Sequence, residues 1–347
     1  MKDRNDASQY EVFRQLRFPM IVLVTFAHSY GKVAEGFSLL TSEWNTYEFL
    51  KLFVSQTLVK VAVPVFFIMS GYLFFANVEK WNLKVYKAKI LRRMKTLLIP
   101  YLIWNLLMAV KLKSFSWSIF WVFWYPAGIQ TDWFGQEHWM TAPVNMPLWF
   151  LRDLIIVSLF TPIIYILVRK LGSWLMALLT ILYLSGFCAF IPGLSAYAVY
   201  FFTFGSFFSI RRMDLLEKLR RFEWPAYILS IALAIAMMLT YNTPIFSSLM
   251  LCFRLVGAVS VFCLALRILS STSKRLPSMV CDSAYFIYLS HYVFFFSFID
   301  TVFFNLFGTS ITVLSIHYLL VPLVKAFLMI IVYLIYSKIM AKGAPAD

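Results

Sequence analysis

Residues 14–31, RQLRFPMIVLVTFAHSYG, decide the fold, because a mostly apolar run lies between two arginines and a histidine. At about 3.6 residues per turn, the steps from Arg17 to His28 make roughly three turns, so both side chains share one face of the predicted helix. Arg14 lies about 40° from that face. The rise from Arg17 carries His28 about 16 Å, to the middle of a bilayer. An ionisable group there is costly and marks a functional site, although a histidine that hydrogen-bonds between helices explains it equally well.

The whole chain has the composition of a membrane protein. Hydrophobic residues make up 61% of its 347 residues and charged residues 14%, where soluble domains are about half apolar and a quarter charged. Runs of about 17–25 apolar residues predict an all-α polytopic protein with about ten transmembrane helices. We expect one domain, 1–347, with a membrane core of about 16–337 and no removable signal peptide. The predicted spans are 16–35, 53–76, 96–112, 147–168, 172–190, 194–210, 222–241, 245–267, 280–303 and 311–337.

The positive charges predict the orientation of the chain. A net charge of +15 could suggest nucleic acid, but 23 of the 31 Lys and Arg residues fall on one side of an alternating ten-span topology. This is the cytoplasmic-side bias of inner-membrane proteins. We therefore expect a multi-pass protein of the bacterial cytoplasmic membrane, with both termini in the cytoplasm, membrane lipids as partners and no nucleic acid. The sequence carries no signal for an oligomeric state.

Two connecting segments carry candidate binding residues. The inner segment 77–95 predicts a basic amphipathic helix whose lysines suit anionic lipid headgroups. Its end, with Arg92, Arg93 and Lys95, suits the phosphates of a cytoplasmic donor. The outer segment 113–146 is rich in tryptophan, which forms either an interfacial belt or a platform for sugar rings. The residues expected to guide an acceptor are Trp133, Trp139, Trp149, Arg152 and Asp153.

Histidine is the group best suited to carry chemistry in this chain. The histidines and cysteines lack metal-ligand spacing, so no metal is expected, and neither a glycine-rich phosphate loop nor a GxSxG motif occurs. Neutral imidazole acts as a general base near pH 7, which suits His28 and a second mid-membrane histidine, His291. Two cations inside apolar runs, Arg254 and Lys325, are either site or structural residues. The Ser-Gly pair at 70–71 predicts a close approach of two helices.

Five stretches together resemble the integral-membrane acyltransferase family 3. The first is the arginine, ten residues and histidine from Arg17 to His28. The other four follow in order and are VPVFFIMSGYLFF at 63–75, RRMKTLLIPYLIW at 92–104, PLWFLRDLIIVSLFTPII at 147–164 and SAYFIYLSHYVFF at 283–295. The resemblance covers about residues 12–337. It implies ten spans, an acyl-CoA donor, usually acetyl-CoA, and acceptors among surface glycans, peptidoglycan and small molecules.

The resemblance also implies roles for individual residues. His28 would be the catalytic histidine and Arg17 its companion, and His291 is a possible partner. The family's inner motif is usually two arginines three apart, whereas here Arg92 is followed by Lys95. Acetyl-CoA would be a co-substrate, so no tightly bound cofactor is implied. The residues expected at the donor phosphates are Arg14, Arg17, Arg92, Arg93 and Lys95.

The predicted function is O-acyl transfer to a carbohydrate hydroxyl, either directly or through an acyl-enzyme. One alternative is a transporter of a lipid-linked glycan or small anion, with Arg254 and Lys325 along its path. Broken helices would favour this transporter. A second alternative is an inactive family member that serves as an assembly partner.

Overall fold

The computed structural model describes residues 2–29, 32–112, 125–131, 137–186, 193–294 and 297–342. They form two compact units. One comprises Met1–Ala62 and Phe222–Asp347, and the other comprises Val63–Arg221. Both are helical, as the apolar runs predicted. The second unit also holds an antiparallel hairpin of β1 (Tyr125–Thr131) and β2 (Glu137–Ala142), which the all-α prediction did not include.

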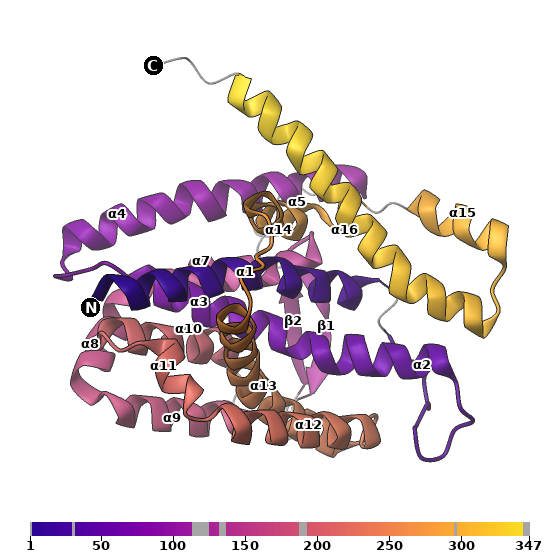
Figure 1. Ribbon diagram of the computed structural model, residues 1–347, viewed down its shortest axis with the longest axis horizontal. Helices are drawn as coiled ribbons and strands as arrows, with labels where there is room; N and C mark the ends of the chain where they lie inside the picture. The colour runs from indigo at the N-terminus through magenta and orange to yellow at the C-terminus, as the bar shows by residue number, and fades with distance from the viewer. Residues whose placement is uncertain are drawn as a thin grey trace. The chain divides into compact units, whose positions relative to one another are not determined.

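In the first unit, the opening helix packs against helices from the end of the chain. Its elements are α1 (Lys2–His28), α2 (Thr46–Leu50), the π-helix η1 (Lys51–Thr57), the 3-10 helix η2 (Leu58–Val61), α12 (Glu223–Leu239), α13 (Pro244–Ser271), α14 (Ser278–Ser290), α15 (Ser297–Phe307) and α16 (Ile311–Lys342). Helix α1 contacts α14, α16 and α13, while α12 pairs with α13 (Figure 1). Phe26, Val59 and Tyr318 form a buried cluster. Ser55 extends this contact by donating its hydroxyl to the Phe26 carbonyl at 2.9 Å.

In the second unit, α10 lies at the centre of the packing. The elements are α3 (Ala62–Phe75), α4 (Leu83–Arg93), the π-helix η3 (Met94–Leu98), α5 (Ile99–Lys111), β1, β2, the 3-10 helix η4 (Met146–Leu148), α7 (Trp149–Leu159), α8 (Thr161–Leu171), α9 (Ser173–Leu184), α10 (Ala196–Ile210) and α11 (Leu215–Arg220). Helix α10 contacts α7, α8 and α9. A Cβ on Gly71 would overlap the Phe202 carbonyl, and one on Gly205 would overlap the Ile68 carbonyl. The backbones of α3 and α10 therefore touch, which confirms the predicted close approach at Gly71.

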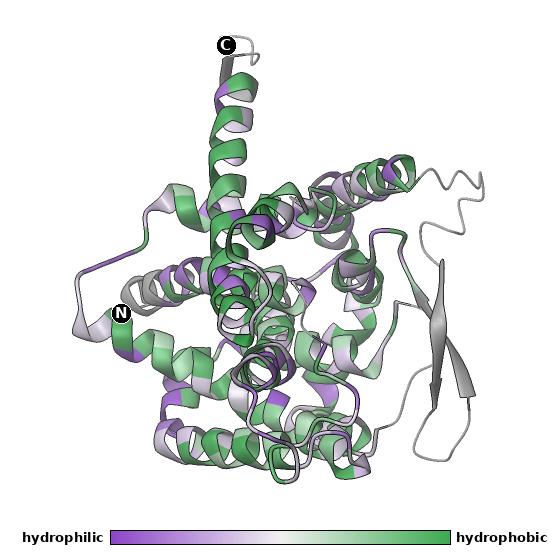
Figure 2. Ribbon diagram, turned by 90° about the vertical axis from the view of Figure 1, so that its right-hand side faces the viewer, coloured by the Kyte–Doolittle hydropathy of each residue, from purple (hydrophilic) through white to green (hydrophobic). Residues whose placement is uncertain are grey.

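The structure supports a polytopic membrane protein. Figure 2 shows apolar residues along most of the helices. Within the described ranges, four helices are long and apolar enough to cross a membrane, and a pair bent by 65° adds a fifth if it is one span. The four are Thr46–Phe75, Leu83–Lys111, Pro244–Ser271 and Ile311–Ile339, and the pair is Met146–Leu159 with Thr161–Leu171. The number of ten spans and the orientation of the termini stay predictions.

Two helices differ from the predicted boundaries. The inner amphipathic segment and the third span form one continuous helix, because α4 passes through η3 into α5. The predicted ninth span, 280–303, is interrupted, because α14 ends at Ser290 and α15 begins at Ser297. His291 lies directly after the end of α14, and its Nδ1 is 2.8 Å from the carbonyl oxygen of Tyr288.

Candidate functional site

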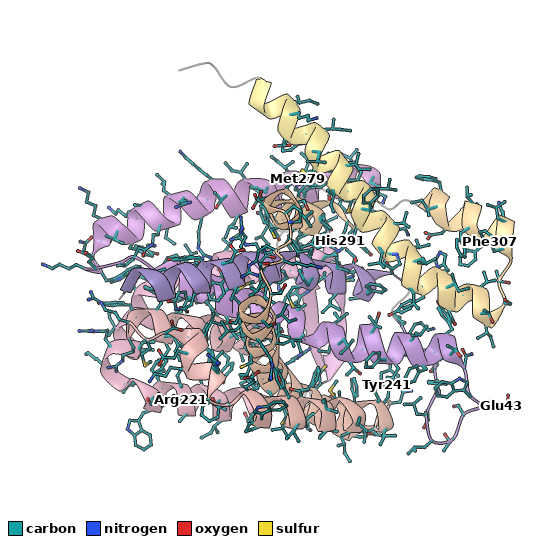
Figure 3. The ribbon with its side chains drawn as sticks, in the orientation of Figure 1. Glu43, Arg221, Tyr241, Met279, His291 and Phe307 are labelled. Atoms are coloured by element: carbon teal, nitrogen blue, oxygen red, sulfur yellow. The ribbon has the colours of Figure 1, made fainter. Side chains whose placement is uncertain are left out.

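Two histidines lie side by side in the first unit. His28 is the last residue of α1. His291 follows the last turn of α14 (Figure 3). Their ring centroids are 5.3 Å apart. The ring of Tyr292 meets His28 edge-on at 5.9 Å. His28 is half-buried and His291 is buried, so the pair lies at the edge of a dry region where polar interactions are strong.

The hydrogen bonds of His291 indicate which ring nitrogen carries the proton. Nδ1 is 2.8 Å from the carbonyl oxygen of Tyr288 and 3.2 Å from that of Ile287. Carbonyl oxygens only accept, so Nδ1 is the protonated donor in the neutral ring. Nε2 then carries the lone pair, and it is buried with no hydrogen-bond partner among the described residues. Nε2 is therefore the nitrogen of this ring that can accept a hydrogen bond or a proton.

A lysine that the sequence analysis did not single out belongs to the same region. Lys60 lies in η2, directly after the π-helix η1, and donates to Oε1 of Gln56 at 3.3 Å. It is close enough to His28 to act on it electrostatically, and Arg254 acts on Lys60 in the same way. Irregular turns of this kind are frequent at functional sites. The available signal was a lysine within the apolar run VKVAVPVFF, the pattern that drew attention to Arg254 and Lys325.

The two arginines at the start of the first span have different surroundings. Arg17 is exposed on α1, and its level along the helix is about 16 Å from that of His28. Arg14 makes a two-pronged ion pair with Glu11, with both bonds at 3.1 Å. Partial burial raises the pKa of Glu11, but hydrogen bonds from Arg14 and Gln15 and the charges of Arg14 and Arg275 outweigh it, so this pKa lies below its ordinary value. The same pair raises the pKa of Arg14.

The inner basic residues belong to the second unit and are not equivalent. Arg92 and Lys95 are exposed. Arg93 points inward, where it donates to Ser158 Oγ at 2.8 Å and to Ser70 Oγ at 2.9 Å. Its guanidinium also lies 4.7 Å from the ring centroid of Phe74. Through these contacts Arg93 links α3, α4 and α7. Arg92 and Lys95 are the exposed cations of the predicted donor motif.

The predicted acceptor residues at the start of α7 form a buried ion pair. Arg152 and Asp153 are both buried, with Arg152 Nε 3.0 Å from Asp153 Oδ1. Ser195 donates to the other carboxylate oxygen at 2.8 Å. Trp149 is half-buried against Tyr197, with ring centroids 6.2 Å apart. Trp139 falls within β2, and Trp133 lies outside the described residues.

A buried ionic cluster explains Lys325 and His317. Asp300 of α15 accepts from Lys325 at 2.9 and 3.0 Å and lies 3.1 Å from His317 Nε2. The ring of Phe304 stacks on His317 at 4.3 Å. This arrangement joins α15 to α16 and supports the structural interpretation of Lys325. Asp300 was missed by the sequence analysis, although a carboxylate inside the run FFFSFIDTVFF was a visible signal.

Comparison with known proteins defines the class. A family model described as "Acyltransferase domain" matches residues 13–338, so the chain belongs to the acyltransferase 3 family. The chain is also similar to the succinoglycan biosynthesis protein ExoH of Rhizobium meliloti (strain 1021), with 27% identity over 263 residues. That match covers 70% of this chain and 65% of the relative, just under two thirds of its length. No solved structure matches the chain.

Proposed function

We propose that this protein is a membrane-bound O-acyltransferase that moves an acyl group from cytoplasmic acyl-CoA to a hydroxyl of a carbohydrate. The observation that carries the proposal is the adjacent pair of imidazoles, His28 and His291, in a chain of the acyltransferase 3 family. The relative named as a succinoglycan biosynthesis protein supports a glycan as acceptor. Acetyl is the acyl group that the family resemblance implies, and it is the one that we propose.

In the proposed reaction, His28 removes the proton of the acceptor hydroxyl while the hydroxyl oxygen attacks the carbonyl carbon of the thioester. The tetrahedral intermediate then collapses, the C–S bond breaks, and His28 returns the proton to the departing sulfur. His291 keeps its own proton on backbone carbonyls, so its Nε2 lone pair can stabilise the imidazolium of His28. The positive charge of Lys60 stabilises the negative charge that develops on the carbonyl oxygen.

The test is transfer from labelled acetyl-CoA in membranes that contain the full chain and a glycan acceptor. His28→Ala should lower transfer by about 100- to 10,000-fold, the usual contribution of a general base. His317→Gln is the matched control, because it removes another buried histidine that lies in the Asp300 cluster. Its transfer per folded protein should equal that of the wild type. Undiminished transfer by well-expressed His28→Ala protein would refute the proposal.

The transporter alternative gains one supporting observation. The break between α14 and α15 and the 65° bend between α7 and α8 are the kind of interrupted helices that transporters use. However, Lys325, one of the two cations placed along the supposed path, is held by Asp300. Thermal stabilisation of the purified protein by CoA separates the two functions, because only the acyltransferase requires a CoA site.

A further inference from the structure

We infer that the second unit holds a nucleotide-binding cavity, which under the proposed function receives the nucleotide end of the acyl-CoA donor. The cavity has a volume of about 610 Å³ and is lined by residues of three separate segments. These are the connection between α3 and α4, helix α8, and the end of α10. A volume of several hundred Å³ is typical of sites for cofactor-sized ligands. None of its lining residues was among the predicted donor residues.

One wall of the cavity is aromatic. Trp81 and Tyr165 stack nearly parallel, with ring centroids 5.5 Å apart and an interplanar angle of 24°. Phe75 packs against both rings, at 4.9 Å from Trp81 and 6.1 Å from Tyr165. An indole and a phenol, both half-buried and both lining the cavity, offer a planar ligand a stacking surface. Stacking on such a surface suits a nucleobase of any kind.

The rest of the lining is positively charged. Lys80, Arg169 and Arg212 contribute three cations, against the single carboxylate of Glu79. Lys80 and Arg169 are exposed. Guanidinium and ammonium groups around one cavity suit phosphate oxygens, which accept charge-assisted hydrogen bonds. A base-stacking wall beside a cationic wall is therefore complementary to a phosphorylated nucleoside.

Hydrogen bonds from two arginines join the segments that line the cavity. Arg212 donates to the Glu79 carbonyl at 3.2 Å, which ties the end of α10 to the segment after α3. The neighbouring Arg211 donates to the Val168 carbonyl at 3.0 Å, which ties the same end to α8. Arg212 has φ 54°, a left-handed conformation that is uncommon for arginine. Such conformations persist where the surroundings enforce them, and they cluster at ligand sites.

The placement of the three segments fits a cytoplasmic ligand. The charge distribution predicts that residues 77–95, 169–170 and 211–221 all lie on the cytoplasmic side, and all three contribute to the cavity. The donor motif that the sequence indicated, Arg92 to Lys95, contributes none of its lining residues. Variants of the motif and variants of the cavity lining therefore show which of the two binds the phosphates.

Calorimetric titration of the purified full chain with adenosine 3′,5′-bisphosphate and with CoA tests the inference. Arg169→Gln should weaken binding of the bisphosphate about tenfold, the usual value of one charge-assisted hydrogen bond. Trp81→Leu should weaken both the bisphosphate and unphosphorylated adenosine. Arg220→Gln, at an exposed arginine of the same unit outside the cavity, should bind like the wild type. Melting without ligand shows that each variant is folded.

Three results would overturn the inference. The first is unchanged affinity in folded Arg169→Gln and Trp81→Leu protein. The second is loss of binding in Arg92→Gln with retention in Arg169→Gln, which would assign the phosphates to the other motif. The third is retention of an anionic phospholipid that depends on Arg169 when the soluble nucleotides do not bind, which would identify a lipid headgroup. If the wild type transfers acetyl groups in any of these cases, the proposed function stands, whereas absence of transfer by the wild type removes that function itself.

Discussion

The Asp300 cluster offers a quantitative test of whether Lys325 is structural. In the single variant Asp300→Leu, Lys325 loses the carboxylate that holds it at 2.9 Å. At that distance, Coulomb attraction at an effective dielectric constant of about 20 comes to about 6 kcal/mol, an upper bound on the interaction. Desolvation offsets part of it, but removal of one partner from a buried ion pair costs about 3–5 kcal/mol. We expect that loss in the free energy of unfolding.

The double variant Asp300→Leu with Lys325→Met tests the same reasoning by removing both charges of the pair. With both charges gone, no buried ion is left unpaired, so the double variant should be more stable than Asp300→Leu alone. Thr301→Val changes the adjacent exposed residue on α15 and should shift the free energy of unfolding by less than about 0.5 kcal/mol. The double variant should also keep wild-type transfer per folded protein, because the cluster is structural.

The assay is unfolding of purified protein in mixed micelles, followed by circular dichroism, with transfer measured on the same samples. A loss below about 1 kcal/mol for Asp300→Leu would contradict a buried and tightly paired cation. The pairing would also be contradicted if the change in unfolding free energy of the double variant equalled the sum of the changes in Asp300→Leu and Lys325→Met, because residues in contact should couple. Loss of transfer in a stable double variant would show that Lys325 takes part in function.

Three further predictions follow from local geometry. Gly71→Ala puts a methyl group against the Phe202 carbonyl and should cost about 1–3 kcal/mol of unfolding free energy, with a neutral result in micelle unfolding contradicting the contact. Lys60→Met should lower transfer about 100-fold at equal expression if the lysine stabilises the oxyanion, and equal transfer would exclude that role. The lowered pKa of Glu11 means that its ion pair with Arg14 stabilises the fold above about pH 4.5 and that this stability is lost as pH falls through the folded-state pKa. Melting of Glu11→Gln should therefore fall less between about pH 6 and pH 3 than melting of the wild type, and identical slopes would contradict the pairing.

The helical content and the apolar segments could be predicted because hydrophobic run length is a property of the chain alone. The close contact at Gly71 was also visible, since a small residue in an apolar run has few other uses. The break after Ser290 was not visible, because the apolar pattern continues through His291 into α15. Only the folded backbone shows that α14 ends at Ser290 and that α15 begins at Ser297.

The candidate site residues also divide into those that the sequence reveals and those that only the folded structure reveals. His28 and His291 stand out because imidazoles are rare in apolar runs. The partner of an ion pair is harder to find, since Asp300 and Lys325 are far apart in the sequence and either could have met another charge. For the same reason, Arg92 and Arg93 were predicted to have similar roles, whereas the contacts of Arg93 with Ser70 and Ser158 separate them.

The hydrogen bonds of His291 support the role that we propose for it as the partner of His28. An imidazole with both nitrogens in water exchanges its proton freely and has no fixed role. Here two carbonyl oxygens of α14 hold the Nδ1 proton, so the lone pair is on Nε2 of a ring whose centroid lies 5.3 Å from that of His28. His291→Gln would interrupt this arrangement while keeping a polar side chain. If His291 acts only by packing, that variant should retain transfer, whereas a role for its lone pair requires a loss that refolding or higher expression does not restore.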